Sequence, residues 1–422
     1  MRAAIAAADP RRCVAARAPA DLRGRACRLI AAGKASAAMT VGLVADVGAV
    51  VHEGIVIGPP GCPQALQREW LARPPAVQVF EADHPLPTDR NVRTARAAHD
   101  VALRCSHDGM PLVVLISGGA SAHLALPRGG VVLDDLRAVT QALLAAGANI
   151  HELNTVRKQL ESLKGGGLAR LAAPAPIDAL ILSDVLGDDP SVIASGPVTP
   201  NPQSEPDAIA VLRSRALDKR FPCLLEWLEE RRARRAATPA SSTPGDVRTT
   251  IVGNNALALA AAADAARATG FEVASIQSLV EGESRDVGGR LARLAIDLRR
   301  AAHKPSAILL GGETTVTVRG GGLGGRNQEL VLAAAIELEQ HDGILIASFG
   351  TDGVDGPTDA AGAWAMGGEH GAVAVARQRG VDARDCLARN DSHRFFSAAG
   401  TLLRTGPTGT NVNDIAFALV YP

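Results

Sequence analysis

The sequence has few aromatic residues and no excess of charge of either sign. Phe, Trp and Tyr together make up 3% of the 422 residues, so the chain offers little surface on which nucleic-acid bases could stack. Its 44 basic residues equal its 44 acidic residues, which leaves no net charge to attract nucleic acid or an anionic membrane. We therefore expect no nucleic-acid partner, and any anion site must be local.

Paired cysteines and long apolar runs are also missing. The six cysteines are scattered without a C-x-x-C pair, which argues against a zinc site and a disulfide framework and fits a reducing cytoplasm. Residues 1–19 are rich in Arg and Ala but lack the continuous apolar core of a signal peptide. The most apolar early run, residues 41–51, contains Asp46 and is too short to cross a bilayer. We expect a cytoplasmic protein without a membrane partner.

The length and one low-complexity segment predict two domains. A chain of 422 residues exceeds a single typical core. The segment Arg231–Asp246 has no hydrophobic periodicity and is rich in Pro, Ser and Thr, which predicts a linker. Short apolar runs followed by helical patterns occur on both sides of it. We predict two α/β domains, residues 1–238 and 246–422.

Buried strands in both halves are predicted to end in glycine beside a polar or charged residue. They lie near Ile30, Ile116, Leu182, Val252, Leu310 and Ile346. Ligands bind outside the carboxyl ends of strands in open parallel sheets, so we expect these loops to face one cleft. Lys34 follows the first strand, from where its ammonium could reach a phosphate. A solvated surface lysine is the alternative.

The segment Gly311–Glu329 has the highest density of glycine and charge. Alternation in Thr314–Arg319 predicts a short strand, and the helical spacing after it predicts a helix over Asn327–Leu338. The glycines between them would let backbone N–H groups approach an anion at the helix N-terminus, with Arg326 where a phosphate would dock. A plain strand-turn-helix corner is one alternative. A dinucleotide site is another, because the glycines formally match G-x-G-x-x-G.

Two further segments of the first half carry candidate ligand groups. Residues 117–123, SGGASAH, follow a buried strand and indicate a second anion-binding turn. The helical pattern over Ile150–Leu171 leaves Asn154 and Arg157 on neighbouring faces, where they could hold a carboxylate. A solvated charged face is the alternative.

Acidic residues cluster in two glycine-containing loops. The first loop holds Asp184, Asp188 and Asp189, which suggests magnesium binding or general-base work. In the second loop Asp352, Asp355 and Asp359 could share a magnesium ion. Ordinary turn chemistry competes with both interpretations.

Together these motifs resemble the class II glycerate kinases, whose carboxy-terminal part is called the MOFRL domain. The matching segments follow the family order over nearly the whole chain: GKASAAM, SGGASA, LNTVRKQLESLKGGGLA, LSDVLGDDPSVIASGP, VGNN, GGETTVTVRGGGLGGRNQE, GTDGVDGPTDAAGA and TGPTGTNVND. The resemblance implies two α/β/α domains, the first Rossmann-like, with the active site in the cleft between them. It also implies transfer of the ATP γ-phosphoryl group, with Mg²⁺, to the 2-hydroxyl of D-glycerate.

The resemblance assigns roles to individual residues. Lys34 and Arg326 become the catalytic pair, and Asp184 the residue that orients or deprotonates the hydroxyl. Asn154 and Arg157 are assigned to the substrate carboxylate. The loops around them supply the remaining candidates, which are Ser117, Gly118 and Gly119 for substrate; Asn255, Gly312, Glu313, Thr314, Gly325, Asp352, Thr408 and Asn411 for ATP; and Asp188, Glu313 and Asp352 for magnesium.

The chain departs from the family pattern in two places. It has KQLE at Lys158–Glu161 where KHLS is common, and His393 where an aromatic residue is common, which bears on the acyl-chain preference. Some members carry the name hydroxypyruvate reductase, so an NAD(P)H-dependent reductase is the alternative function, and a non-catalytic binding module is a third class. The expected partner is a small molecule, and the sequence leaves the oligomeric state open, with a homodimer as the candidate.

Overall fold

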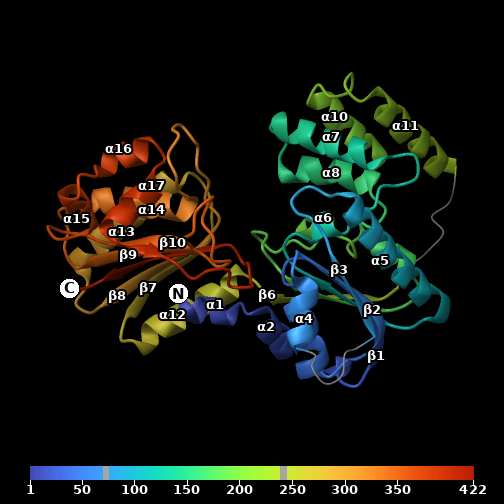
Figure 1. The fold of residues 1–422 in the computed structure, drawn as a ribbon, viewed down its shortest axis with the longest axis horizontal. Coiled ribbons are helices and arrows are strands. Elements are labelled where there is room, and N and C mark those ends of the chain that lie inside the picture. Colours follow the sequence, from blue (N-terminus) through green and yellow to red (C-terminus); the bar gives the residue numbers. More distant parts are fainter. Residues whose placement is uncertain (70–75, 238–244) are drawn as a thin grey trace. The chain divides into compact units, whose positions relative to one another are not determined.

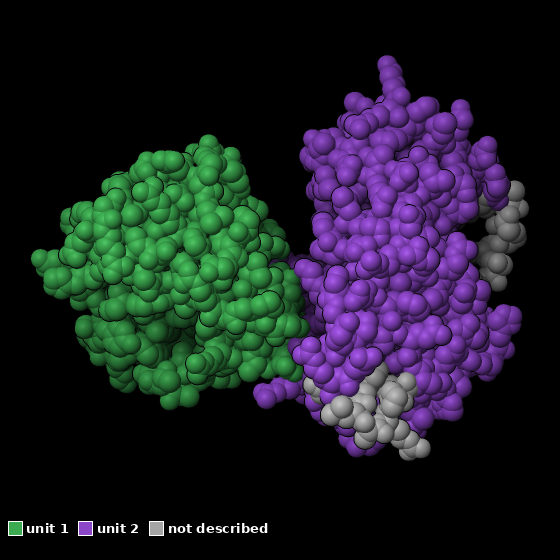
Figure 2. Space-filling model, in the orientation of Figure 1, with its two compact units in different colours: residues 1–9, 253–422 green, residues 10–252 purple. Residues whose placement is uncertain are grey.

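The computed structural model describes residues 1–69, 76–237 and 245–422, which divide into two compact units. Unit 2 comprises residues 10–252, and unit 1 comprises residues 1–9 and 253–422 (Figure 2). Helices and strands alternate through both units (Figure 1), which confirms the α/β class. No helix in the described part of the chain is long and apolar enough to cross a membrane.

Unit 2 is built on a six-stranded sheet in the order β3-β2-β1-β4-β5-β6. The strands are β1 (Ala26–Ala32), β2 (Val50–Gly58), β3 (Val77–Glu81), β4 (Leu112–Ile116), β5 (Ile177–Leu182) and β6 (Val247–Gly253). All pairs from β3 to β5 are parallel. Strands β4 and β5 are buried along their whole length, as their unbroken apolar runs predict. The strand order is that of doubly wound sheets, whose ligands bind where the order reverses, here between β1 and β4. The Rossmann-like label stays a prediction.

The helices of unit 2 form a sheet-packing group and a separate cap. The first group and the short helical turns are α2 (Pro10–Arg17), η1 (Ala20–Leu22), α3 (Ser36–Val41), η2 (Gly42–Val47), α4 (Cys62–Glu69), α5 (Asp89–Asp108), α6 (Ala120–His123), α9 (Gly167–Ala172) and η3 (Ile193–Ser195). The cap comprises α7 (Leu133–Ala145), α8 (Ile150–Leu160), α10 (Glu205–Ser214) and α11 (Pro222–Ala237). It has its own apolar core and gathers at one end of the sheet (Figure 1). The predicted helix over Ile150–Leu171 is wrong in length, because Glu161 is already extended and α9 starts anew.

Unit 1 contains a mixed sheet in the order β11-β10-β9-β12-β8-β7. Its strands are β7 (Glu272–Val280), β8 (Ser306–Gly312), β9 (Ile344–Gly350), β10 (Gly362–Met366), β11 (Leu402–Leu403) and β12 (Asp414–Val420). Among the described strands of unit 1, β7 and β8 pair in parallel and the remaining pairs are antiparallel. The last strand, β12, inserts antiparallel between β8 and β9 and aligns Asp414 with Gly312 and Gly350. The ends of β8 and β9 therefore share one sheet edge with the start of β12.

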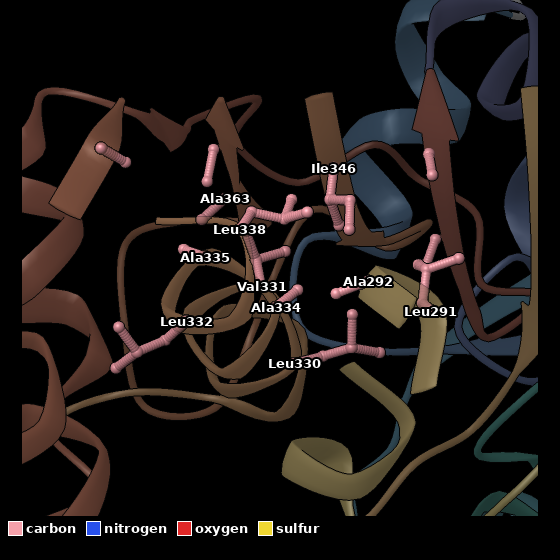
Figure 3. Close-up of a cluster of buried hydrophobic side chains, with 14 of the residues drawn as sticks. Leu291, Ala292, Leu330, Val331, Leu332, Ala334, Ala335, Leu338, Ile346 and Ala363 are labelled. Carbon is pink, nitrogen blue, oxygen red and sulfur yellow. The ribbon is translucent and has the colours of Figure 1, made fainter. Parts of the chain in front are cut away.

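The helices of unit 1 are α1 (Arg2–Ala7), α12 (Asn255–Ala268), α13 (Ser284–Ala301), α14 (Arg326–Glu337), α15 (Ala372–Gln378), α16 (Ala383–Ala388) and α17 (Ser392–Ala399). The apolar faces of α13 and α14 meet the sheet in the main core, where Leu291, Val331 and Ile346 are buried (Figure 3). The predicted helix over Asn327–Leu338 is confirmed as α14, one residue earlier at each end. Thr314–Arg319 is not a strand, and only one isolated bridge, from Thr315 to Glu283, forms there.

The two units differ from the predicted ranges in two places. Strand β6 completes the sheet of unit 2, although it lies beyond the predicted end at residue 238. Residues 1–9 belong to unit 1, where the Thr410 hydroxyl donates to the carbonyl of Ala8 at 2.6 Å. Of the predicted linker, residues 231–237 are the end of α11, and residues 238–244 lie outside the described residues.

Candidate active site

Lys34 lies in a tight turn after β1 whose backbone groups are already engaged. The N–H of Gly33 donates to Ile57 O at 3.1 Å, that of Lys34 to Gly118 O at 2.8 Å, and that of Ala35 to Ser117 Oγ at 3.0 Å. Gly33 has a φ of +120°, which favours glycine. The turn therefore has no spare N–H for an anion at these three positions. The Lys34 ammonium is exposed and has no carboxylate partner among the described residues, so it is the group of this turn that can reach a ligand.

The turn after β4 interlocks with the Lys34 turn and with Asp184. A side chain at Gly118 would collide with the Asp184 carboxylate, which follows β5. A side chain at Gly119, whose φ is +87°, would meet Lys34 and the ring of His84. Four predicted residues, Ser117, Gly118, Gly119 and Asp184, are therefore brought together around Lys34. They surround the carboxyl ends of β1, β4 and β5.

Two histidines border this cluster. His84 follows β3, and burial together with the nearby Lys34 ammonium lowers its pKa. His123 is fully buried, and its Nδ1 accepts the N–H of Gly33 at 3.2 Å. Burial lowers the pKa of His123 to about 4, with His84 and Lys34 adding smaller effects. His123 is therefore neutral near pH 7 and holds the Lys34 turn by accepting a hydrogen bond.

Asn154 and Arg157 lie on α8 and are differently engaged. The Oδ1 of Asn154 accepts the Ser195 hydroxyl at 2.9 Å, while its buried Nδ2 has no hydrogen-bond partner among the described residues. The Ser195 hydroxyl also lies 2.9 Å from that of Ser121, two residues after Gly119. Arg157 Nε lies 3.4 Å from Glu161 Oε1. Through the two serines, Asn154 connects to the turn after β4.

In unit 1, Arg326 is the first residue of α14 and is held by two carboxylates. Its Nε and Nη2 donate to the two oxygens of Asp414 at 2.5 and 3.1 Å, and its Nη1 donates to Glu313 at 2.7 Å. Burial raises the pKa of Asp414 to about 6, although Arg326 opposes this. Burial lowers the pKa of Arg326, but Asp414 and Glu313 raise it above its ordinary value. The arginine is therefore charged and fixed in direction.

The start of α14 is capped by a protein carboxylate rather than left open. Asp355 accepts the backbone N–H groups of Asn327 and Gln328 at 3.0 and 2.9 Å, and their side-chain amides at 3.2 and 2.9 Å. A side chain at Gly325 would collide with Asp355. The N-terminus of α14 thus does bind an anion, but for these two N–H groups the anion is the carboxylate of Asp355 and not a ligand.

The glycines of residues 320–325 pack against protein. Side chains at Gly320 and Gly322 would collide with the backbone of Arg389, and one at Gly324 with Ser392. The carboxylate of Asp391 accepts the N–H of Leu323 at 3.1 Å. Close approach of two chain segments therefore accounts for these glycines. Gly321 is the exception, because a Cβ at this position would meet nothing within 4 Å.

Other residues assigned to ATP also form bonds within unit 1. Asn255 donates to the carbonyls of Val412 and Asp414 at 2.8 and 3.0 Å, which fixes the start of β12. Gly312 ends β8, where a side chain would collide with Val280. The remaining hydroxyl, amide and carboxylate contacts involve Thr314 with Ser284 (2.8 Å), Asp352 with the N–H of Val354 (3.0 Å), Thr408 with the carbonyl of Thr351 (2.6 Å) and Asn411 with the N–H of Asn413 (3.1 Å). A role in binding ATP stays a prediction for each.

The acids proposed to bind magnesium do not form one cluster. Asp355 caps α14, Asp359 pairs with Arg404 at 2.8 Å, and Asp352 accepts the N–H of Val354 in its own loop. The three carboxylates therefore do not share an ion. No group of three or more His, Cys, Asp or Glu side chains in the described ranges could hold a metal ion. Mg²⁺ in phosphoryl-transfer sites is usually held by one or two carboxylates with phosphate oxygens and waters. The half-exposed Glu313 carboxylate fits that smaller requirement.

Sequence reasoning missed several residues that organise these sites. Asp414 ends the motif NVND and begins strand β12. A polar residue at the start of a strand was the sequence feature that could have identified it as a site residue. His123 stands in an apolar helical turn, and Lys164 in a glycine-rich loop, where surface positions are usual for such residues. Neither carries a pattern that reveals its burial, because His123 bonds to the distant Gly33 and Lys164 bonds to the distant Ser121 as well as to the nearby Glu161.

Two family models match the chain. Residues 1–229 match a domain of unknown function, DUF4147, and residues 306–414 match the MOFRL family. The D-glycerate 2-kinase of Thermotoga maritima is 36% identical over 395 residues, covering 93% of this chain and 90% of the relative. The chain belongs to the class II glycerate kinase family with a MOFRL domain.

The family includes a solved structure with the same architecture. A crystal structure described as glycerate kinase from Thermotoga maritima matches with a TM-score of 0.86 at 35% identity, covering 99% of this chain and 97% of that one. Another relative, from Agrobacterium vitis, is called a putative hydroxypyruvate reductase and is 40% identical over 424 residues, covering 99% of this chain and 92% of the relative. Family membership thus leaves two names for the activity.

Proposed function

We propose that this chain transfers the γ-phosphoryl group of ATP to the 2-hydroxyl of D-glycerate, giving 2-phosphoglycerate and ADP. The observation that carries the proposal is that the Asp184 carboxylate lies against Gly118 and the Lys34 side chain lies against the neighbouring Gly119. A relative that covers nearly the whole chain bears the name D-glycerate 2-kinase. A cation for the phosphoryl oxygens beside a base for the hydroxyl proton is what this reaction requires.

In the proposed reaction the 2-hydroxyl oxygen attacks the γ-phosphorus while the bond to the β-phosphate bridging oxygen breaks. Asp184 accepts the hydroxyl proton, and ADP carries away the electrons of the broken bond. Lys34 and Arg326 act as cations toward the phosphoryl oxygens, where charge must be stabilised without covalent help. Magnesium, which Glu313, Asp352 and Asp188 are candidates to hold, would neutralise phosphate charge when bound.

The substrate carboxylate is assigned to Asn154 and Arg157. The Nδ2 group of Asn154 is buried and has no partner in the described part of the chain, so a carboxylate oxygen would satisfy it. The Nη groups of Arg157 form no hydrogen bond among the described residues, and only Nε faces Glu161. An amide N–H and a guanidinium are donors that suit the carboxylate of a hydroxy acid.

A hydroxypyruvate reductase is the second candidate, because one relative carries that name and because His84 lies beside Lys34. A histidine next to a cation could protonate a carbonyl oxygen during hydride transfer. Against it, most glycines of the G-x-G-x-x-G match pack against residues 389–392, and no strand precedes them within the described segment 313–325. A dinucleotide fingerprint requires both a strand and close access to the glycines.

A paired assay of the purified chain tests the proposal. One arm measures ADP release from ATP and magnesium with and without D-glycerate, and the other measures NADH oxidation with hydroxypyruvate. Glycerate-dependent ADP release is expected, and phosphorus NMR of the product then distinguishes 2- from 3-phosphoglycerate. NADH oxidation without ADP release would reject the kinase assignment.

A further inference from the structure

Lys164 is one of the largest fully buried side chains among the described residues, with 1% of it exposed. Its ammonium donates to Glu161 Oε2 at 2.7 Å and to the carbonyl of Ser121 at 2.6 Å. Burial, followed by repulsion from Arg157, lowers the pKa of Lys164 to about 7 against the attraction of Glu161. A buried ion pair is often replaceable by apolar residues without loss of stability, so stability alone is a weak reason for this one.

The Lys164 loop joins three segments that border the site. The two residues after Lys164 bond to the segment that follows β5. The N–H of Gly165 donates to the carbonyl of Ser195 at 3.0 Å, and the N–H of Gly166 donates to the carbonyl of Gly196 at 2.8 Å. The ammonium itself reaches the turn after β4 through Ser121. The hydroxyls of Ser121 and Ser195 then connect both loops to Asn154. The lysine thus ties the turn of Ser117–Ser121 to the helix that presents Asn154.

Glu161 extends this connection to Arg157. The Glu161 side chain is fully buried, and its second oxygen, Oε1, lies 3.4 Å from Arg157 Nε. One carboxylate therefore faces both the buried lysine and the arginine assigned to the substrate. Its loss would leave Lys164 without its counter-charge and would free Arg157 to turn.

We propose that Glu161 and Lys164 are positioning residues that set Asn154, Arg157 and the turn of Ser117–Ser121 for the substrate carboxylate. This inference rests on the proposed function. Neither residue touches the transferred phosphoryl group in this proposal, so the effect should fall on glycerate rather than on ATP.

The chain offers a matched control. Glu205 on α10 is also buried, with 2% of its side chain exposed, and it pairs with Arg231 Nε at 3.0 Å in the same unit. Glu161→Gln and Glu205→Gln each remove one buried carboxylate charge. We expect both to lower the melting temperature, while only Glu161→Gln raises the KM for D-glycerate, by about tenfold or more. The KM for ATP should stay within about twofold in both variants.

A second variant covers poor folding of Glu161→Gln. Replacing Glu161 by Leu together with Lys164 by Met removes both charges, so it should recover stability without recovering the KM for glycerate. A double variant with the wild-type KM would overturn the proposal. An unchanged KM for glycerate in Glu161→Gln would overturn it as well.

Hydrogen–deuterium exchange provides a readout that does not depend on activity. Peptides covering residues 117–124 and 194–197 should exchange about tenfold faster in Glu161→Gln than in the wild type, but not in Glu205→Gln. Unchanged exchange would show that the pair does not hold these loops. A wild-type protein that releases no ADP with glycerate would reject the proposed function, while the exchange result would still test the positioning.

Discussion

Two cations at two sheet edges are held in opposite ways. Lys34 is exposed and has no carboxylate partner among the described residues, but its backbone turn is fixed by acceptors from two other segments, the end of β2 and the turn after β4. Arg326 is half-buried, and its guanidinium is fixed by Asp414 and Glu313. In the first case the protein fixes the main chain and leaves the charge mobile. In the second it fixes the charge itself.

The difference indicates different tasks for the two cations. An ammonium on a flexible stem can follow a phosphoryl group as bonds form and break, since it acts as a point charge. A guanidinium held by two carboxylates presents its two remaining N–H groups in fixed directions and costs no reorganisation during reaction. We infer that Arg326 contributes a preorganised charge and Lys34 an adaptable one. Variants at both cations and at the groups around Arg326 test this contrast.

The largest effect is expected from Arg326→Ala. Turnover should fall by about 10³- to 10⁵-fold, the range that one arginine at a transferred phosphoryl group can supply. Arg326→Lys should recover little, because an ammonium cannot pair with both oxygens of Asp414 in the same fixed direction. The measurement is steady-state ADP release, with circular dichroism to check the fold. Near-normal turnover in either variant would remove the fixed charge from the mechanism.

Lys34→Ala should lower turnover by a smaller factor, about 10²- to 10³-fold. Lys34→Arg should retain more activity than Arg326→Lys, because an unpaired charge tolerates a change of side-chain shape better than the bidentate ion pair of Arg326 with Asp414 does. The melting temperature should not change in either Lys34 variant, because the exposed ammonium has no carboxylate partner in the described ranges. A drop in melting temperature would instead mean that Lys34 is structural.

Asp414→Asn tests how Arg326 is fixed through the pH dependence of turnover. Burial raises the pKa of Asp414 from 3.8 to about 6, so the carboxylate that fixes Arg326 is lost as the pH falls through this value. We expect an acid limb near pH 6 in the wild type that is absent in Asp414→Asn, whose turnover should be about tenfold lower near pH 8.

This acid limb should not reflect unfolding. The folded chain binds the proton of Asp414 more tightly than the unfolded chain does, so protonation of this group favours folding as the pH falls from about 6 toward 3.8. Circular dichroism across the same pH range distinguishes the two causes. An unchanged acid limb in Asp414→Asn would assign it to another group.

The parts of the sites that depend on local pattern can be predicted from the sequence. The strands that precede Lys34 and Asp184 are visible as apolar runs followed by turn residues, and the structure gathers them at one edge of the sheet. Unit 1 is harder to predict, because β12 inserts between β8 and β9 only through long-range pairing. That insertion places Asp414 against Arg326 from 88 residues away.

Charge beside glycine predicts a ligand site in residues 311–329, but the same pattern also arises where two segments pack closely. Asp355 and residues 389–392 are the partners there, and neither is near in sequence. The burial of Lys164 escapes prediction for the same reason, since one of its two partners, the carbonyl of Ser121, belongs to the distant helix α6. Local pattern therefore locates the loops, and long-range contacts decide what each residue does.

The smallest effects are expected from a pair of neighbouring glycines near Arg326. A Cβ at Gly322 would lie 2.5 Å from Asp391 Cβ, whereas one at Gly321 would meet nothing within 4 Å. Gly322→Ala should therefore lower the free energy of unfolding by about 1–3 kcal/mol, as overpacking does.

Gly321→Ala should change neither the melting temperature nor the KM for ATP, because this turn serves packing against residues 389–392. Thermal melts and ATP titrations of the two variants measure both quantities side by side. If the turn received a phosphate, a methyl group at its open position would obstruct the ligand, and the KM for ATP would rise without any loss of stability. That result would return the anion to the glycine turn and make Arg326 part of a phosphate cradle rather than a separately fixed charge.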